Sequence, residues 1–332
     1  MKHMPDDPCL EQVGEFDVIA RISASLPSAP GVLLGPGDDT AVVAAPDGRV
    51  ALTTDMLVEG THFRLDWSSA EDVGHKAAAA NLADIAAMGA VPTAIVVAFG
   101  APGTLHLSWV LGCSAALRDE AALAGAAVVG GDVVAAERVI VSVTAIGDLR
   151  GRSPILRSGA RPGDVLAIAG RIGCSAAGLA LLQAGLGAAE AVACHRRPQP
   201  PYAAGPAAAL AGATAMIDVS DGLVADARHL AQASGVVVAV ETARLAPEPA
   251  VRQAAELLGD DPWAWILHGG EDHALLATFP EDVRLPEPFV PIGRIHAIDT
   301  AVLQPSVTVD GERWERGGGF DHFAGEAGWN RA

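Results

Sequence analysis

The chain has 332 residues, of which half are apolar, and it carries a formal net charge of −18. This length and composition allow two globular domains with large buried cores and exclude a chain that is mostly disordered. The 40 Asp and Glu residues against 22 Lys and Arg argue against a general nucleic-acid binder, which needs a basic face.

Strands and helices alternate along the first half of the chain. Residues 50–55 predict a short strand that ends in polar residues, and Ser69 with Asp72 forms a capping box for a helix over 70–90. A strand over 93–100, a helix over about 104–124 and a strand over 138–147 follow. This alternation is typical of an α/β domain.

The polar segment 157–164, rich in Gly, Pro and charge, is typical of a domain boundary. A strand over 165–170, a helix over 175–185 capped by Ser175, and a Pro-rich connection over 196–206 come next. Residues 213–235 predict a strand, an acidic turn and a helix. Further strands are expected over 236–241, 273–279 and 289–295, so the second half is also a sheet with helices.

The four cysteines are widely spaced and form no CxxC pair, which disfavours a zinc site or a disulfide framework. The opening residues MKHMPDDPCLEQ lack the apolar core of a signal peptide, and no window holds about 18 uninterrupted apolar residues. We therefore expect a cytoplasmic protein with reduced cysteines and without membrane or nucleic-acid partners.

Acidic residues recur where predicted strands end or where glycine pairs turn the chain. Hard oxygen ligands with few histidines favour Mg²⁺, and Mg²⁺ in enzymes usually accompanies phosphates. Local alternatives remain open, because Asp in a Gly-rich turn, or before a helix, also serves the backbone alone. The acidic residues in question are Asp38, Asp39, Asp55, Asp132, Asp218, Asp221, Glu271 and Asp272.

Asp84 differs from these, since it lies inside the Ala-rich helix and has small apolar neighbours. A buried carboxylate without a partner is costly, so either a metal ion or Lys76 is expected to compensate it. The sequence holds no P-loop, protein-kinase or EF-hand motif, which excludes the common phosphate and calcium modules.

Ten motifs, in order and over nearly the whole chain, resemble those of the thiamine-monophosphate kinases, a family in the superfamily of aminoimidazole ribonucleotide synthetase. They are GEF (14–16), GPGDDTA (35–41), TTDMLVEGTHF (53–63), HKAAAANLADIAAMGA (75–90), VGGD (129–132), RSGARPGD (157–164), SAAGL (175–179), IDVSDGL (217–223), GGEDH (269–273) and GFDHF (319–323).

This resemblance implies a two-domain α/β fold with mixed sheets. An N-terminal domain over 14–150 would bind ATP and Mg²⁺, and its sheet would form a barrel across a homodimer. A C-terminal α/β domain over 151–330 would cover the active site.

The resemblance also implies roles for particular residues. Mg²⁺ ligands are expected at Asp38, Asp39, Thr53, Thr54, Asp55, Asp84, Asp132, Asp218 and Asp221. ATP contacts are expected from Gly131, Asp132, Arg157 and Ser220, and contacts to thiamine monophosphate from His62, Glu271 and Phe320. Ala83 and Val133 depart from the family pattern, where serine and threonine are frequent, so hydroxyl contacts at these positions are in doubt.

The implied reaction transfers a phosphoryl group from ATP to thiamine monophosphate, giving thiamine diphosphate, with several Mg²⁺ ions assisting and a K⁺ requirement left open. The acceptor phosphate has a second pKa of about 6, so it is ionised without a general base. Neither a covalent nucleophile nor an obligatory base is expected. The alternatives are another ATP-using enzyme of the superfamily, such as aminoimidazole ribonucleotide synthetase, and a non-catalytic acidic metal-binding protein.

Overall fold

The structure is a computed structural model and describes residues 7–27, 29–35, 41–187, 189–298 and 304–314. The chain divides into two compact units. The first holds the described residues of Met1–Ile85 and Pro92–Asp148, and the second those of Ala86–Val91 and Leu149–Ala327. Both units combine helices with a sheet, which confirms a mixed α/β protein of two domains. The bounds of 14–150 and 151–330 remain a prediction.

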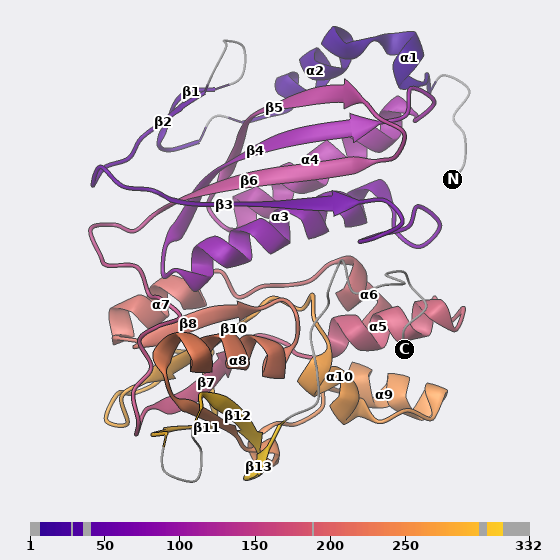
Figure 1. The fold of residues 1–332 in the computed structure, drawn as a ribbon. Coiled ribbons are helices and arrows are strands. Elements are labelled where there is room, and N and C mark those ends of the chain that lie inside the picture. Colours follow the sequence, from indigo (N-terminus) through magenta and orange to yellow (C-terminus); the bar gives the residue numbers. More distant parts are fainter. Residues whose placement is uncertain (1–6, 28, 36–40, 188, 299–303, 315–332) are drawn as a thin grey trace. The chain divides into compact units, whose positions relative to one another are not determined.

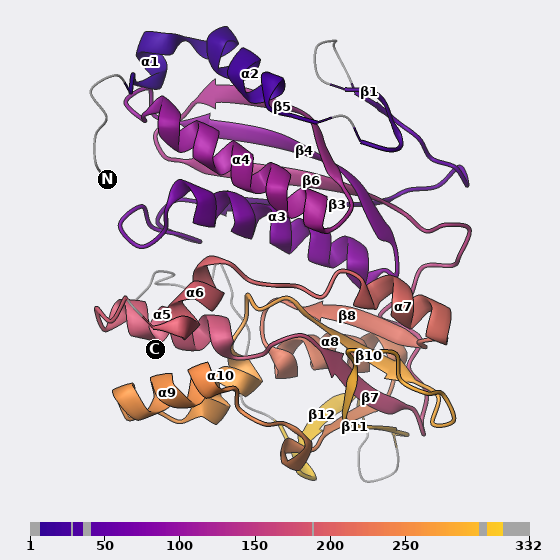
Figure 2. The same ribbon diagram turned by 180° about the vertical axis from the view of Figure 1, so that it is seen from behind.

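The first unit is built on a four-stranded sheet with strand order β3-β6-β4-β5. Strand β3 is antiparallel to β6, and β4 is parallel to β5. Figures 1 and 2 show helices α3 and α4 on one face of this sheet. The bounds are β3 Ala51–Val58, α3 Ala70–Ala87, β4 Val91–Ala101, α4 Leu107–Leu123, β5 Ala127–Ala135 and β6 Ile140–Asp148.

Helix α3 is the buried centre of the first unit. The predicted capping box begins it, because the Asp72 carboxylate accepts from the Ser69 N–H at 3.0 Å and Ser69 Oγ accepts from the Asp72 N–H at 3.2 Å. Its alanines are buried on several sides, which small side chains allow. A Cβ on Gly74 would lie 2.2 Å from the carbonyl oxygen of Cys113, so glycine permits the close packing of α3 on α4.

Shorter elements complete the first unit. Strands β1 (Val32–Leu34) and β2 (Val42–Val43) pair antiparallel, and Val32 and Val43 pack against the buried Ala94, Ala127 and Val129. Helices α1 (Leu10–Val13) and α2 (Glu15–Ala24) precede them. The sequence did not predict these four elements.

The second unit is built on a seven-stranded mixed sheet with strand order β13-β12-β9-β11-β7-β10-β8. Its strands are β7 Val165–Ala169, β8 Ala215–Val219, β9 Val237–Val240, β10 Ala274–Phe279, β11 Val290–His296, β12 Ser306–Val309 and β13 Glu312–Arg313. Its helices are α5 Cys174–Gln183, α6 Glu190–Arg196, α7 Ala204–Ala211, α8 Leu223–Ser234, α9 Pro249–Leu258 and α10 Pro262–His268, with a short 3-10 helix at Thr242–Arg244.

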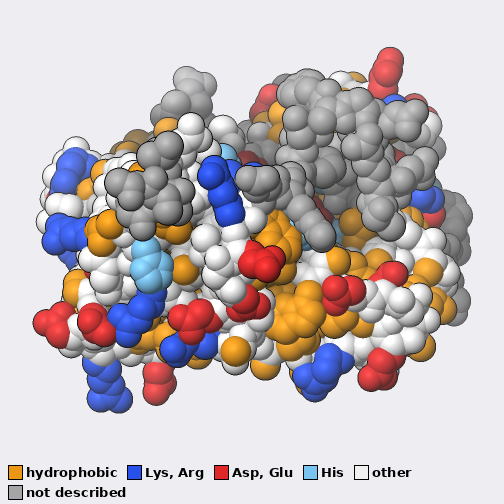
Figure 3. Space-filling model, turned by 60° about the horizontal axis from the view of Figure 1, so that its bottom comes forward, with side chains coloured by type: hydrophobic (Ala, Val, Ile, Leu, Met, Phe, Trp, Pro, Cys, Tyr) orange, Lys and Arg blue, Asp and Glu red, His pale blue; other side chains and the backbone are white. Residues whose placement is uncertain are grey.

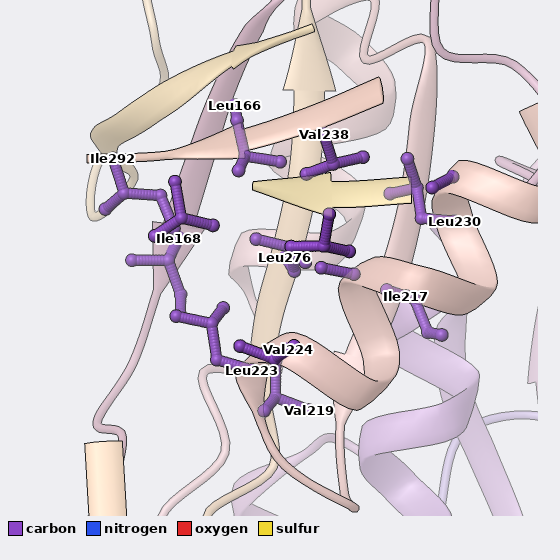
Figure 4. Close-up of a cluster of buried hydrophobic side chains, with 14 of the residues drawn as sticks. Leu166, Ile168, Ile217, Val219, Leu223, Val224, Leu230, Val238, Leu276 and Ile292 are labelled. Carbon is purple, nitrogen blue, oxygen red and sulfur yellow. The ribbon is translucent and has the colours of Figure 1, made fainter. Parts of the chain in front are cut away.

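Period-two alternation gives this sheet two apolar faces. Leu166 and Ile168 point into the cluster that α8 covers with Leu223 and Leu230, which Figure 4 shows. The intervening Ala167 belongs to the cluster on the other face, where α7 packs. Because both faces are buried, the strands are continuously apolar, as their sequences predicted. Helices α5, α6, α9 and α10 pack on one another beside the sheet (Figures 1 and 2).

Three local predictions were wrong. Strand β3 does not end at Asp55 but continues to Val58, because its pairing with β6 extends to Ile140. Gly130 and Gly131 do not end their strand either, since β5 remains paired with β4 through them. Ser175 does not cap α5, whose N-cap is Gly173.

Charge is spread over the surface that Figure 3 shows, where acidic and basic side chains are interspersed among apolar ones. No helix among the described residues is long and apolar enough to cross a membrane.

Candidate functional site

Predicted metal ligands of the first unit meet where β3 faces α3. The hydroxyl of Thr53 donates to Oδ2 of Asp84 at 2.7 Å. Asn81, one turn before Asp84, accepts from the backbone N–H of Asp55 at 2.9 Å. β3 is an edge strand, so α3 satisfies a backbone donor that the sheet leaves unpaired. We call Thr53 with Asp84 the Thr53–Asp84 pair; it places one hydroxyl and one half-buried carboxylate together.

Strand alternation separates the other two β3 candidates. Asp55 projects on the same side as Thr53, and its side chain is exposed. Thr54 projects on the opposite face, where its hydroxyl donates to the carbonyl oxygen of Val143 at 3.0 Å and accepts from Thr144 at 3.0 Å. The side chain of Thr54 is therefore engaged within the sheet. A role for Thr54 beside Thr53 and Asp55 would therefore need its backbone, because its Cβ points to the other face of the sheet.

Lys76, the alternative partner of Asp84, is buried, and its ammonium donates to the carbonyl oxygen of His62 at 3.4 Å. Nδ1 of His62 accepts from the N–H of Val58 at 3.0 Å, in the turn that follows β3. This bond fixes Nδ1 as an acceptor and ties the ring to the turn. His62 thus has a structural function here, alongside the substrate contact that the resemblance implies.

Gly131 and Asp132 lie inside the edge strand β5. A Cβ on Gly131 would lie 2.2 Å from the carbonyl oxygen of Val97, so only glycine fits next to β4. Asp132 is exposed, and its Oδ1 accepts from the N–H of Val133 at 3.0 Å. Asp132 is accordingly not a residue of a turn, and its carboxylate is open to solvent on the edge of the sheet.

Two acidic segments of the second unit lie side by side because their strands are paired. Antiparallel pairing of β8 with β10 brings Ser220–Gly222, which follows β8, to Gly269–His273, which precedes β10. The N–H of Glu271 donates to the carbonyl oxygen of Ser220 at 2.8 Å. We call these two segments, with Asp218 and Val219 at the end of β8, the acidic loops. They unite the predicted motifs IDVSDGL and GGEDH.

Steric limits hold the acidic loops in place. A Cβ on Gly270 would lie 2.1 Å from the carbonyl oxygen of Ser220. Glu271 and His273 adopt positive φ angles of 65° and 55°, a conformation that is unfavourable for residues with a side chain. Such backbone strain is frequent at functional sites.

Carboxylates crowd around the first turn of α8. Asp226 accepts from the N–H of Asp221 at 3.0 Å, so Asp226, and not Asp221, serves the backbone here. Burial raises the pKa of Asp226 to about 7, and the nearby carboxylates of Asp218 and Asp221 act in the same direction. His273 Nδ1 lies 3.2 Å from Oδ2 of the buried Asp218. The sequence patterns did not single out Asp226, although its place in the first helical turn after IDVSD was a usable signal.

Glu271 has a buried neighbour that the sequence did not reveal. Nδ1 of His195, in α6, lies 3.5 Å from Oε2 of Glu271 and 3.0 Å from Oγ of Ser175. The adjacent Asp272 accepts from the N–H of Ser175 at 2.9 Å, and burial raises its pKa to about 7. No sequence pattern links positions 175, 195 and 271, because Ser175 and His195 meet through packing of α5 on α6, and Glu271 comes from the loop before β10.

The remaining candidates are Arg157, Ser220, Asp38, Asp39 and Phe320. Arg157 is exposed, and its carbonyl oxygen accepts from the hydroxyl of Ser234 at 2.8 Å. Ser220 is half-buried within the acidic loops. Asp38, Asp39 and Phe320 lie outside the described residues. Among the residues that are described, no three His, Cys, Asp or Glu side chains lie close enough together to hold a metal ion.

Comparison with known proteins defines the class to which this chain belongs. The model of the AIR synthase related protein N-terminal domain matches residues 37–149, and that of the AIR synthase related protein C-terminal domain matches residues 161–278. The two-domain α/β chain is therefore an AIR synthase related protein.

Individual relatives narrow this class. Thiamine-monophosphate kinase of Mycobacterium tuberculosis is 51% identical over 96% of this chain and 94% of its own length. The Corynebacterium glutamicum enzyme of the same name is 42% identical over 87% and 88%. The structure of AaThiL complexed with AMPPCP and TMP has a TM-score of 0.76 at 32% identity, and the match covers 97% of this chain and 100% of that one. The chain belongs to the thiamine-monophosphate kinase family.

Proposed function

We propose that this chain transfers the γ-phosphoryl group of ATP to thiamine monophosphate, giving ADP and thiamine diphosphate. The observation that carries this function is the 51% identity to a thiamine-monophosphate kinase over nearly the full length of both chains. A structural relative has been captured with AMPPCP, an analogue of ATP, and with TMP, which correspond to the two substrates of this reaction.

The acceptor phosphate is itself the nucleophile. With a second pKa of about 6, it is largely dianionic at neutral pH and needs no general base. The obstacle is repulsion between two polyanions, so catalysis consists of alignment and neutralisation of charge during an in-line transfer. None of the acidic side chains acts as a covalent nucleophile in this proposal.

Magnesium binding is assigned to the oxygen donors of both units. In the first unit these are the Thr53–Asp84 pair, Thr54, Asp55 and Asp132, with Asp38 and Asp39; in the second they are Asp218 and Asp221. The donors fit Mg²⁺ because all are hard oxygens. Burial is the main cause that raises the pKa of Asp226, and the carboxylates of Asp218 and Asp221 add to it, a repulsion that a divalent cation would relieve. Bound Mg²⁺ supplies neutralisation of the phosphate charge.

The other proposed contacts follow from side-chain chemistry. Arg157 can hold two phosphate oxygens of ATP at once, and Gly131 and Ser220 contact the same nucleotide. Glu271 offers a carboxylate to the aminopyrimidine or to the positive thiazolium of thiamine monophosphate. Phe320 stacks on that cation, and His62 completes the substrate contacts.

The proposed homodimer is supported by the face of the first unit's sheet opposite α3. On β3, Leu52 is 65% exposed and Met56 is 52% exposed, on the same side as Thr54. Val134 on β5 is 54% exposed. Exposed apolar side chains on a sheet are typical of an interaction surface. Pairing with the same sheet of a second copy would close the barrel.

Incubation with ATP, Mg²⁺ and thiamine monophosphate, followed by chromatography, tests the reaction. We expect thiamine diphosphate and ADP in equal amounts, and no product when EDTA is present. Formation of aminoimidazole ribonucleotide from its precursor with ATP, without thiamine diphosphate, would favour the rival synthetase. Binding of Mg²⁺ without turnover of any of these substrates would favour a metal-binding protein.

A further inference from the structure

Cys174 and Cys194 lie together in the second unit, at the packed ends of α5 and α6. Both are reduced in this structure, and their residues are 0% and 8% exposed. Ser175 and His195, which directly follow the two cysteines, are in contact through Oγ and Nδ1 at 3.0 Å, so Cys174 and Cys194 lie side by side, and each thiol shifts the pKa of the other. The sequence offered no sign of this pair, because 19 residues separate the two positions and no CxxC motif is present.

The guanidinium of Arg171 lies next to Cys194. Nη1 of Arg171 donates to Sγ of Cys194 at 3.2 Å, and Nε of Arg171 lies 3.3 Å from Oε2 of Glu248. A cation and a hydrogen-bond donor beside a sulfur favour its thiolate, which is the nucleophilic form of cysteine. The neighbouring thiol of Cys174 and the guanidinium of Arg171 outweigh burial and lower the pKa of Cys194.

Two carboxylates near the pair act against thiolate formation. Glu248, from the start of α9, raises the pKa of both thiols, and Asp272 from the acidic loops raises that of Cys174. His195 lies next to Cys194 in the chain and contacts Ser175. The neighbouring Cys194 is the main cause that raises the pKa of Cys174, so Cys194 loses its proton before Cys174 does.

Close packing brings the two helices that carry the cysteines together. A Cβ on Gly178 would lie 2.0 Å from the carbonyl oxygen of Ala191 and 2.9 Å from Cβ of His195. Gly178 is one turn after Cys174, and His195 directly follows Cys194. Glycine therefore lets the backbones of α5 and α6 approach more closely at this point than other residues would.

Cys113 in the first unit provides a contrast. It is 1% exposed, and burial together with Glu71 raises its pKa to about 12. No cation is among the causes of that shift. Cys113 is accordingly a structural apolar residue, as buried cysteines usually are.

We propose that Cys174 and Cys194 form a redox-active dithiol that hydroperoxides oxidise to an intramolecular disulfide. The Cys194 thiolate attacks the hydroxyl-bearing oxygen of ROOH, the O–O bond breaks, and the alkoxide leaves and takes a proton from water. The sulfur of Cys174 then attacks the sulfur of the Cys194 sulfenic acid. Hydroxide leaves with the thiol proton as water, so two electrons pass from the dithiol to the peroxide. This site is independent of the proposed kinase activity.

The test treats the reduced full-length chain with hydrogen peroxide at pH 7, then unfolds it in N-ethylmaleimide and analyses its peptides by mass spectrometry. We expect peptides linked through Cys174 and Cys194, which dithiothreitol separates, while Cys113 is alkylated. In Cys174→Ser, dimedone should label Cys194 as a sulfenic acid. Arg171→Met should slow the peroxide reaction at least about threefold at pH 7, since less thiolate is present.

The matched control is Cys113→Ser, which should leave the oxidation rate unchanged. The proposal fails if the wild-type chain gives no Cys174–Cys194 link, or if Cys113 is oxidised as fast as Cys194. It also fails if Arg171→Met reacts at the wild-type rate. None of these readouts uses phosphoryl transfer, so failure here is distinguishable from failure of the proposed function.

Discussion

Replacement of Gly270 by alanine tests whether the acidic loops work as one unit. The added Cβ would lie 2.1 Å from the carbonyl oxygen of Ser220, whereas ordinary contacts begin at 3.4 Å. The neighbouring atom belongs to the backbone, so no side-chain rotation relieves the clash. The two loops must therefore separate by about 1 Å, since contacts this short are strongly repulsive.

The size of the effect follows from this displacement. Separation weakens the 2.8 Å hydrogen bond between the N–H of Glu271 and the carbonyl oxygen of Ser220. Overpacking of this kind destabilises a protein by about 1–3 kcal/mol. A misplacement of about 1 Å can lower activity about 100-fold. We therefore expect Gly270→Ala to lose kcat/KM for thiamine monophosphate about 100-fold while the chain still folds.

Steady-state kinetics and thermal unfolding provide the assay, with Gly187→Ala as the matched control. A Cβ on Gly187 would meet no atom within 4 Å, so this variant should behave as the wild type in both measurements. If Gly270→Ala kept kcat/KM within twofold of the wild type, the close approach of the loops would not matter for the reaction.

Three further predictions concern charge and assembly. Asp84→Asn should lower turnover at least about 100-fold through loss of metal binding. The free energy of unfolding should change by only about 1 kcal/mol, because the amide oxygen still accepts from Thr53. Near-normal turnover in this variant would show that Asp84 is not a metal ligand. For Asp272 the folded pKa of about 7 exceeds the ordinary pKa of 3.8, so the unfolded chain loses its proton first and stability falls as pH rises from about 4 to about 7. Urea unfolding of Asp272→Asn should show a shallower fall over this range, and an unchanged slope would refute the assignment. Leu52→Asp should convert a dimer to a monomer, as measured by light scattering. Leu123 lies on α4 and is 77% exposed, and Leu123→Asp should leave the dimer intact. A Leu52→Asp variant that stays dimeric would exclude the barrel interface.

The regular elements could be predicted where local pattern and packing agree. The capping box of Ser69 and Asp72 determined the start of α3, and its 3.0 Å and 3.2 Å hydrogen bonds are local. Apolar runs such as 165–170 predicted buried strands, because both faces of the second sheet are covered. Short elements such as β1 and β2 have too few residues for a periodic signal.

The site was predictable in its residue types but not in its geometry. The polar residues Thr53, Thr54 and Asp55 are typical of a strand end, but the eight-residue pairing with β6 continues β3 through them. The motifs IDVSDGL and GGEDH are far apart in the sequence, and nothing in their spacing predicts a contact. They lie side by side because β8 and β10 pair antiparallel. His195 reaches Glu271 only through helix packing, which a linear pattern does not contain.

The most direct measurement follows the phosphoryl group itself. Wild-type chain is incubated with Mg²⁺, thiamine monophosphate and ATP labelled at the γ-phosphorus, and the label is located after separation of the products. Transfer between the two substrates predicts that the label enters thiamine diphosphate in a one-to-one ratio with the ADP formed. Label recovered only as inorganic phosphate, with thiamine monophosphate unchanged, would contradict the proposed reaction.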